Sequence, residues 1–413
     1  MLALTIEAMG AKGEGIATGP IYVPLALPGE RLMATVAGRR GALECILQSS
    51  PERVAPVCPH FGDCGGCALQ HWRDDAIGAW KRARIEEALA RAGVGGEVLE
   101  PMTVAAHERR RVALHARQDG GDIRLGFKAA RSWRLVDVGV CMVADERIVA
   151  ALPALRALAA ALFDHPLSAP SLHVTATDSG LDVDVTGIER RSGGLPGDAR
   201  VRAAALARAA DLARLTLAGE VLFLARAPTV RLTGVPVVLP PGAFLQACSS
   251  AERAITDFIV ARAAGSRRIV DLYCGVGTFS LPLARLAPVW AADSSAASVA
   301  ALAAASSWPG LKPVRAEVRD LDRRPILARD IKVGDTVIFD PPRAGAAAQA
   351  AQLARSPAST IIAVSCNPAT FARDAAILGE AGWRAGPTLP VDQFRWSAHI
   401  ELVAAFYRRS ASS

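Results

Sequence analysis

A cysteine that follows an apolar segment near the carboxyl end of the chain has the clearest potential for chemistry. Residues 360–364 predict a buried strand, and Ser365-Cys366-Asn367-Pro368 comes directly after it. A helix is expected to begin near Pro368, and a helix N-terminus lowers the pKa of a neighbouring thiol. Cys366 is therefore predicted to be a nucleophile. The alternative is a small apolar cysteine in the core, which is the commoner fate of a lone cysteine.

Two carboxylates belong to the same predicted sheet. Residues 336–339 predict a strand that ends on Asp340, followed by two prolines and Arg343. The prolines fix φ and hold Asp340 at the carboxyl edge of the sheet, where ligands bind, and this pattern is typical of methyltransferases. Glu401 stands at the start of a later strand, residues 400–406, and is predicted to be the general base. Taken singly, either residue could be a solvated charge at a strand end.

A glycine turn upstream indicates a cofactor site. Residues 268–273 predict a buried strand that runs into a turn containing Gly275 and Gly277. Glycines tolerate positive φ, so a ligand can approach the strand end and the next helix N-terminus. Asp293 ends the next strand, where a carboxylate can accept both ribose hydroxyls. Two glycines instead of three favour S-adenosylmethionine over NAD, although an unrelated α/β protein could also have such a turn.

A thiolate next to such a cofactor indicates one kind of methyl transfer. Carbon 5 of uracil is a poor nucleophile, but a thiolate that adds to carbon 6 places electron density on carbon 5. Carbon 5 can then take the methyl group, and a base must afterwards remove its proton so that the cysteine leaves. These residues therefore predict methylation of carbon 5 of a uridine, with Cys366 as the nucleophile and Glu401 as the base.

Four further cysteines suggest a metal centre. Cys58, Cys64 and Cys67 have a Cys-x5-Cys-x2-Cys spacing with glycines between them, and Cys141 is the natural fourth ligand. Four thiolates suit zinc or an iron–sulfur cluster. The spacing is neither that of a zinc ribbon nor that of radical enzymes, which indicates a structural or RNA-positioning role.

The elements around these residues predict a multi-domain chain. Residues 1–54 read as short strands with glycine turns, which predicts a small, OB-like β-barrel. Residues 55–240 predict an α+β central domain, with a helix near 201–215 and part of 72–105 packing on the catalytic domain. Residues 241–413 alternate between strands and helices, which predicts a Rossmann-like α/β domain.

Composition sets limits on the partners. The 413 residues carry a net charge of +7 with an isoelectric point of about 9.2, and most of the 47 basic residues are arginines, which suit phosphate contacts. A genome rich in alanine and arginine explains the charge equally well. No apolar stretch is long enough to cross a membrane, so we expect a cytoplasmic protein, a monomer without an obligate protein partner.

Taken together, these motifs resemble the RNA uracil-5-methyltransferase family, most closely its iron–sulfur branch that modifies 23S ribosomal RNA. The resemblance covers nearly the whole chain, and it implies that the N-terminal barrel is a TRAM domain. It implies that the four upstream cysteines bind a 4Fe–4S cluster. It also implies a set of residues that contact S-adenosylmethionine: Gln246, Tyr273, Thr278, Asp293, Asp320 and Asp340.

The chain departs from the family pattern at three places. Cys248 and Thr278 each stand where the family often has asparagine, and Arg395-Trp396 lies in a run that the family writes Phe-Pro-x-Thr-x-His. Four other interpretations stay open. They are a transfer-RNA uracil-5-methyltransferase, a cytosine-5 methyltransferase, a catalytically inactive RNA-binding protein and a zinc-stabilised RNA binder.

Overall fold

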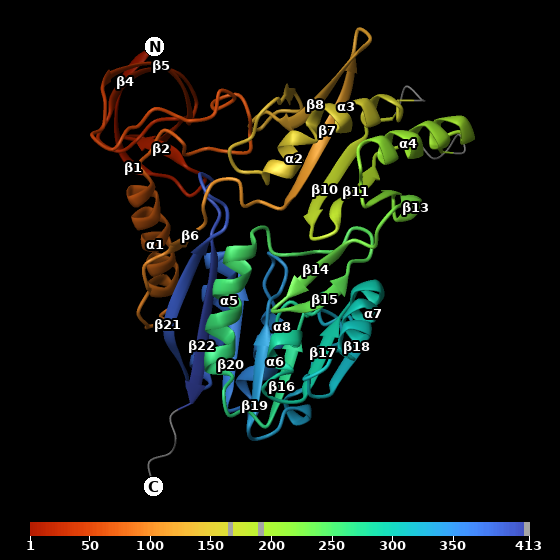
Figure 1. Ribbon diagram of the computed structural model, residues 1–413. Helices are drawn as coiled ribbons and strands as arrows, with labels where there is room; N and C mark the ends of the chain where they lie inside the picture. The colour runs from red at the N-terminus through yellow and green to blue at the C-terminus, as the bar shows by residue number, and fades with distance from the viewer. Residues whose placement is uncertain (164–167, 189–193, 409–413) are drawn as a thin grey trace.

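The computed structural model describes residues 1–163, 168–188 and 194–408, and it opens with a closed five-stranded barrel (Figure 1). The strands close in the order β1-β2-β3-β5-β4 around a core that contains Ile6, Val23 and Leu32. The predicted small barrel is therefore confirmed. Its strands are β1 (Leu2–Met9), β2 (Glu14–Ala17), β3 (Ile21–Pro24), β4 (Arg31–Ala37) and β5 (Arg40–Gln48).

A seven-stranded sheet forms the middle of the chain, in the order β13-β12-β11-β10-β7-β8-β9. Its strands are β7 (Arg111–Asp119), β8 (Asp122–Lys128), β9 (Leu135–Asp137), β10 (Ser171–Thr177), β11 (Gly180–Thr186), β12 (Arg214–Leu217) and β13 (Glu220–Leu224). Its helices are α2 (Glu146–Ala150), α3 (Leu152–Ala160) and α4 (Gly197–Ala209). Leu114, Leu155 and Val183 are completely buried between the helices and the sheet.

The helix expected near 201–215 is wrong at its carboxyl end. Helix α4 stops at Ala209, Asp211 adopts a left-handed backbone with φ of 50°, and the Leu212 N–H donates to the Ala207 carbonyl at 3.0 Å. That turn ends a helix. The residues from Arg214 onwards instead form β12, because the strand pairs with β11 and buries all four of its side chains.

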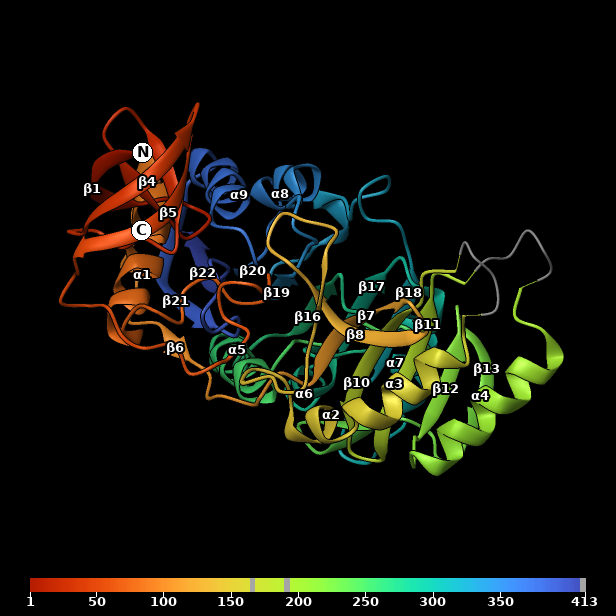
Figure 2. The ribbon, with the colours of Figure 1, turned by 90° about the horizontal axis from the view of Figure 1, so that it is seen from above.

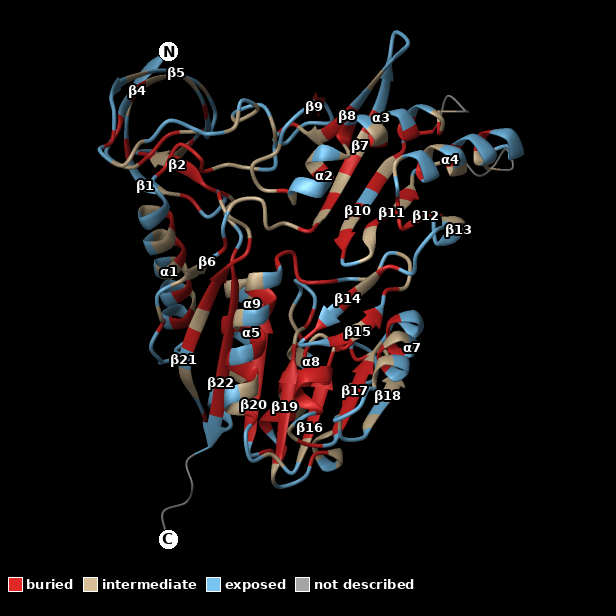
Figure 3. Cartoon of the chain, viewed as in Figure 1, coloured by how far each residue is buried: buried red, intermediate tan, exposed pale blue. Residues whose placement is uncertain are grey.

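An eight-stranded sheet forms the C-terminal part, in the order β18-β17-β16-β19-β20-β22-β21-β6. Its strands are β6 (Met102–Thr103), β16 (Arg268–Leu272), β17 (Val289–Asp293), β18 (Val314–Val318), β19 (Asp335–Phe339), β20 (Thr360–Ser365), β21 (Trp383–Asp392) and β22 (Glu401–Arg408). Strands β16 to β20 are parallel, and β22 is antiparallel to β20. The central strands are buried (Figure 3). This is the predicted Rossmann-like architecture.

Helices flank this sheet, and the barrel and the middle sheet lie above the ends of its strands. The helices are α5 (Ser249–Arg262), α6 (Ser280–Leu283), α7 (Ala296–Ala305), α8 (Ala347–Ala354), α9 (Pro368–Glu380) and the short 3-10 helix η1 (Ala328–Asp330). The barrel and the middle sheet lie above the carboxyl ends of the parallel strands (Figure 1), and β1 and α4 lie at opposite ends of the molecule seen from above (Figure 2). Within the described ranges, no helix combines the length and the apolar character needed to cross a membrane.

Two segments from before residue 241 pack with the C-terminal sheet. Helix α1 (Asp74–Arg91) lies against α9 and buries Ile85 and Leu89 in the core of that sheet. The hairpin of β14 (Thr229–Leu232) and β15 (Val235–Val238) joins the core on the other face. The division into 1–54, 55–240 and 241–413 therefore remains an interpretation of the sequence.

A buried ion pair joins α1 to the end of β21. Lys81 Nζ lies 2.6 Å from Asp392 Oδ2, and the Lys81 side chain is fully buried. Burial lowers the pKa of Lys81 and raises the pKa of Asp392, while each partner opposes the shift of the other. Lys81 Nζ also donates to the Phe394 carbonyl at 3.4 Å. The pair therefore fixes the backbone that follows β21.

We predict that Lys81→Met lowers the free energy of unfolding by about 3–5 kcal/mol, because Asp392 is left buried without its partner. Urea unfolding followed by circular dichroism measures the change. Arg91→Ala removes an exposed pair with Glu87 on the same helix and serves as the control, with an expected loss below about 1 kcal/mol. Equal losses in the two variants would contradict the prediction.

Candidate active site

The predicted site residues meet where the parallel strands end. A cavity of about 620 Å³ opens at this edge. The structure brings seven of the eight predicted catalytic and cofactor residues to its lining: Gln246, Tyr273, Asp293, Asp320, Asp340, Cys366 and Glu401. A volume of this size is typical of a cofactor site. Thr278 is absent from the lining, since it lies beyond the turn that the Gly277 N–H closes on the Cys274 carbonyl at 2.9 Å.

Strand register explains why Cys366 and Glu401 are neighbours. Ser365 at the end of β20 pairs with Leu402 in the antiparallel strand β22. The next position along β20 is Cys366, and it lies opposite Glu401, the first residue of β22. An antiparallel strand starts where its parallel neighbour ends, so the two side chains come to the same edge.

The turn after β16 is shaped to accept a nucleoside. Gly275 has a φ of 54°, and its N–H donates to Asp293 Oδ2 at 2.9 Å. Asp293 Oδ1 accepts from the Ser295 N–H at 2.8 Å. The Asp293 carboxylate is thus fixed in place with lone pairs left over for ribose hydroxyls. Tyr273, with a φ of 62°, leads into the turn and is strained for a residue other than glycine.

Asp320 lies on the loop after β18 at the far end of this cavity. Its Oδ1 accepts from the N–H groups of Asp322 and Arg323, both at 3.1 Å. The Tyr273 hydroxyl donates to Asp322 Oδ1 at 3.2 Å, and burial together with that carboxylate raises the pKa of Tyr273. The loop and the tyrosine therefore form one wall of the cavity.

Hydrogen bonds between two side-chain amides connect the carboxylates of Asp340 and Glu401. Gln246 Nε2 donates to Asp340 Oδ2 at 3.2 Å, and Gln246 Oε1 accepts from Gln393 Nε2 at 2.8 Å. Gln393 Oε1 in turn accepts from the Ala247 N–H at 2.8 Å. A hydrogen bond from Gln393 also lowers the pKa of Glu401 against the larger effect of its burial. Gln246 thus orients the carboxylate of Asp340, and Gln393 orients that of Glu401.

Burial controls the protonation of the reactive groups. It raises the pKa of Asp340 to about 7, and burial together with the Asp340 charge raises the pKa of Glu401 to about 8. A carboxylate with so high a pKa is a stronger base than an exposed glutamate.

The expected low pKa of Cys366 is wrong for this structure. Burial, with the charges of Glu401 and Asp340, raises the pKa of Cys366 to about 11, and Arg343 lowers it only in part. Although α9 begins at Pro368, burial and the two carboxylates keep the pKa of Cys366 above that of a free thiol. The thiol proton must therefore be lost during the reaction.

A second cavity of about 500 Å³ lies between the middle sheet and this edge. Cys366 and Glu401 line it as well as the first cavity. Arg109 and Arg111 line its other side. The two reactive residues thus stand where the cavities meet. This arrangement allows transfer of a group from a cofactor in one cavity to a substrate in the other.

The four upstream cysteines line a third cavity of about 370 Å³: Cys58, Cys64, Cys67 and Cys141. The Gly66 N–H donates to Cys64 Sγ and the Ala144 N–H to Cys141 Sγ, both at 3.4 Å. Burial, with the neighbouring cysteines, raises the pKa of Cys67 to about 12. In the part of the chain that is described, no three histidine, cysteine or acidic side chains lie close enough to hold a metal ion. The expected metal centre therefore stays a prediction.

The departures from the family pattern have contacts of their own. Cys248 is buried, and its Sγ donates to the Gln393 carbonyl at 3.5 Å. Arg395 Nη2 and Trp396 Nε1 donate to the two oxygens of Asp74, at 2.6 and 3.0 Å. Arg395 and Trp396 thus attach the β21–β22 connection to the start of α1, whereas Cys248 contacts the backbone of Gln393.

Gln393 is the main site residue that the sequence did not indicate. It follows a strand that ends without a motif typical of a site. Its partner Gln246 is 147 positions away in the sequence, so only the folded chain brings the two together. Arg109 and Arg111 were also missed, because in an arginine-rich chain their charge gives no signal. Arg343, noted only as part of a motif, is the cation that opposes the rise of the Cys366 pKa.

Comparison with known proteins decides the family. The family model described as tRNA (Uracil-5-)-methyltransferase matches residues 239–409. The 23S rRNA (uracil(1939)-C(5))-methyltransferase RlmD of Chromohalobacter salexigens is 34% identical, over 96% of this chain and 87% of that protein. The chain belongs to the RNA uracil-5-methyltransferase family. It is thus an enzyme, and the predicted family is confirmed.

Two further proteins are similar along the full chain, one relative by sequence and one solved structure. An RNA methyltransferase of Caulobacter vibrioides is 52% identical over 99% of this chain and 100% of its own length. The crystal structure of a Pyrococcus abyssi tRNA (uracil-54, C5)-methyltransferase in complex with S-adenosyl-L-homocysteine has a TM-score of 0.77 and 25% identity. It covers 98% of this chain and 99% of that one. The similarity therefore extends beyond the C-terminal sheet to the barrel and middle sheet.

We predict that methylation speeds up by about fiftyfold in total as the pH rises from 6 to 8, and less steeply near pH 8, because Glu401 must lose a proton with a pKa of about 8. The measurement is a single-turnover rate at saturating RNA and S-adenosylmethionine. Binding of S-adenosylhomocysteine over the same range separates this effect from the titration of Asp340. A rate that stays constant from pH 6 to 8 would contradict the role of Glu401.

Proposed function

We propose that this enzyme methylates carbon 5 of a uridine in 23S ribosomal RNA, with Cys366 as nucleophile and Glu401 as base. The observation that carries the proposal is that these two residues line both the cofactor cavity and the cavity below the middle sheet. No other pair of reactive side chains among the described residues is shared between those two cavities.

The reaction begins at Cys366. Its thiol gives its proton to solvent water, and Sγ adds to carbon 6 of the uracil, which moves an electron pair towards carbon 5. S-adenosylmethionine, when bound, supplies the methyl group that carbon 5 takes. Glu401 then accepts the proton from carbon 5, and the returning electron pair expels the Cys366 sulfur from carbon 6. The hydrogen bond from Gln393 orients the Glu401 carboxyl for this step.

Five side chains are proposed to hold the cofactor: Gln246, Tyr273, Asp293, Asp320 and Asp340. The cavity fits this role, because the Asp293 carboxylate and the Gly275 turn suit a ribose. Asp340 follows β19, the strand between β16 and β20, and therefore lies between this ribose site and Cys366. Thr278 is left out of the proposed contacts because it does not line the cavity.

A ribosomal RNA substrate is supported by the relative named as a 23S rRNA enzyme, which covers almost the whole chain. The solved neighbour acts on transfer RNA, which is the alternative substrate. The closed barrel and the middle sheet would grip the RNA while the target base leaves its stack, and the barrel is proposed to be a TRAM domain. We also propose that the enzyme acts as a cytoplasmic monomer without a further protein partner.

We expect Cys366→Ala to abolish methylation of a 23S rRNA transcript and to form no covalent complex with it. Glu401→Gln should slow turnover by about 10²–10⁴-fold, because the carbon 5 proton has no acceptor, and the protein–RNA adduct should accumulate. Denaturing gel electrophoresis detects the adduct, and labelled cofactor measures the turnover.

Cys45→Ser is the matched control, because this exposed cysteine lies on the barrel strand β5. It should leave both readouts unchanged. Full methylation by Cys366→Ala would contradict the nucleophile. An adduct that is equally scarce in Glu401→Gln and the wild type would contradict the base.

We also propose that the four upstream cysteines hold a 4Fe–4S cluster. Four thiols on one cavity are the donor set that such a cluster requires, and two of them already accept backbone N–H groups. The cavity shares Arg109 and Phe394 with the cavity below the middle sheet, so the cluster would support that wall and take no part in the reaction.

Protein purified without air should be brown and contain about four iron atoms and four acid-labile sulfides per chain. Cys64→Ser should lose most of the iron, whereas Cys45→Ser should keep it. A colourless, zinc-loaded protein would contradict the cluster and favour a zinc site.

A further inference from the structure

The loop from 239 to 246 is a wall shared by two cavities. Gly242, Ala243 and Phe244 line both the cofactor cavity and the cavity below the middle sheet. The loop ends at Gln246, whose side chain holds Asp340. Any displacement of this loop would therefore alter both cavities and the carboxylate between them.

Three arginines of the middle part hold the two ends of this loop. At its start, Arg214 Nη1 donates to the Leu239 carbonyl at 2.8 Å. At its end, Arg111 Nη1 donates to the Leu245 carbonyl at 2.8 Å, and Arg110 Nε donates to the Gln246 carbonyl at 3.0 Å. Each bond meets a backbone carbonyl, so the contacts fix the path of the chain independently of the loop's side chains.

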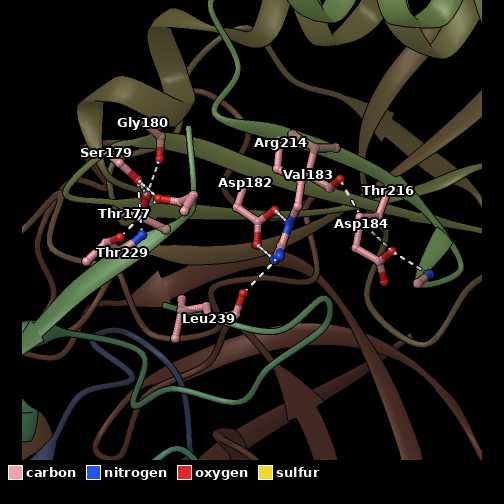
Figure 4. Close-up of polar contacts among 12 residues, drawn as sticks. Thr177, Ser179, Gly180, Asp182, Val183, Asp184, Arg214, Thr216, Thr229 and Leu239 are labelled. Atoms are coloured by element: carbon pink, nitrogen blue, oxygen red, sulfur yellow. Dashed lines mark hydrogen bonds and ion pairs between the residues drawn. The ribbon is translucent and has the colours of Figure 1, made fainter. Parts of the chain in front are cut away.

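Arg214 is itself held rigidly. Its Nε and Nη2 donate to the two oxygens of Asp182 at 2.8 and 2.7 Å, a two-point contact drawn in Figure 4. Strands β11 and β12 pair Asp182 directly with Arg214. Both side chains are less than 10% exposed, and the Leu239 carbonyl faces the Arg214 nitrogen that does not contact Asp182 (Figure 4). The sheet thus presents a fixed donor to the loop.

The same strands shape the loop at Gly242. This glycine has a φ of 67°, and a Cβ built on it would lie 3.6 Å from Asp184 Oδ2. Asp184 Oδ1 accepts from the Thr216 hydroxyl at 2.5 Å, which ties that carboxylate to β12 (Figure 4). The middle sheet therefore meets the loop at its start, near its middle and at its end.

Stability alone is a poor reason for such a pair. The free energy lost when two charges are removed from water offsets much of their mutual attraction. Apolar side chains of similar size therefore often stabilise a fold equally well. What the Asp182–Arg214 pair offers is direction, because the guanidinium leaves one donor in a fixed position. That donor meets the loop that both cavities share.

We propose that the Asp182–Arg214 pair and Arg111 are positioning residues, through which the middle sheet sets the loop that shapes the cofactor cavity. Neither arginine lines that cavity, so their effect on the cofactor passes through the loop. The effect on RNA methylation rests on the proposed function, whereas the effect on cofactor affinity does not.

The test measures binding of S-adenosylhomocysteine by calorimetry and methylation kinetics on a 23S rRNA transcript. Asp182→Asn with Arg214→Met removes both charges of the pair, so neither remains buried alone. It should weaken S-adenosylhomocysteine binding at least tenfold and lower kcat by up to about 100-fold, as expected for a displacement of about 1 Å. Arg111→Met removes an arginine that forms no ion pair with any described residue, and it should weaken the same binding without unfolding the chain.

The matched control is Asp211→Asn with Arg226→Met. Arg226 also pairs with an aspartate and donates to a backbone carbonyl of the middle part, Ser179, but it does not touch the loop. It should leave S-adenosylhomocysteine affinity within twofold of the wild type. Thermal unfolding identifies variants that fail to fold, and Arg214→Lys, which cannot make the two-point contact, should give an intermediate affinity.

Unchanged S-adenosylhomocysteine affinity in both the Asp182/Arg214 and the Arg111 variants, with both chains folded, would overturn the proposal. Equal weakening in the control would also overturn it, since the effect would then be general loosening of the sheet. If S-adenosylhomocysteine binding falls as expected while no RNA is methylated even by the wild type, the positioning role stands and the proposed function fails.

Discussion

The antiparallel pairing of β22 with β20 is the constraint on which the site depends. Because Ser365 pairs with Leu402, the residue after the end of one strand faces the residue that begins the other. A single-residue slip would turn Glu401 to the opposite face of the sheet. The buried apolar faces of both strands oppose such a slip, so the core that stabilises the sheet also specifies the distance between nucleophile and base.

Contacts from outside the C-terminal sheet complete the site. Lys81 holds the backbone next to Gln393, and Gln393 connects Gln246 with Glu401. The middle sheet supplies the arginines that hold the 239–246 loop. The Rossmann-like sheet thus places the reactive groups, and contacts from the earlier parts of the chain hold the backbone around them, in keeping with a similarity that extends over the whole chain.

Local sequence predicted those features that depend on strand ends and glycine turns. Buried strands followed by Asp293, Asp340 or Cys366 are visible as apolar runs with a polar stop, and the fold placed all three at one edge. Gln393 and Arg214 act through partners distant in the sequence, which no local pattern reveals. The raised pKa of Cys366 was missed for the same reason, since it comes from burial in the folded chain and from two carboxylates on other strands.

The most direct test of the central claim is a map of 5-methyluridine in the ribosomal and transfer RNA of a strain whose only copy of this enzyme carries Cys366→Ala. The account predicts that one uridine of 23S rRNA loses its methyl group while transfer RNA keeps all of its own. An unchanged map would contradict the role of Cys366, and a loss confined to transfer RNA would contradict the substrate.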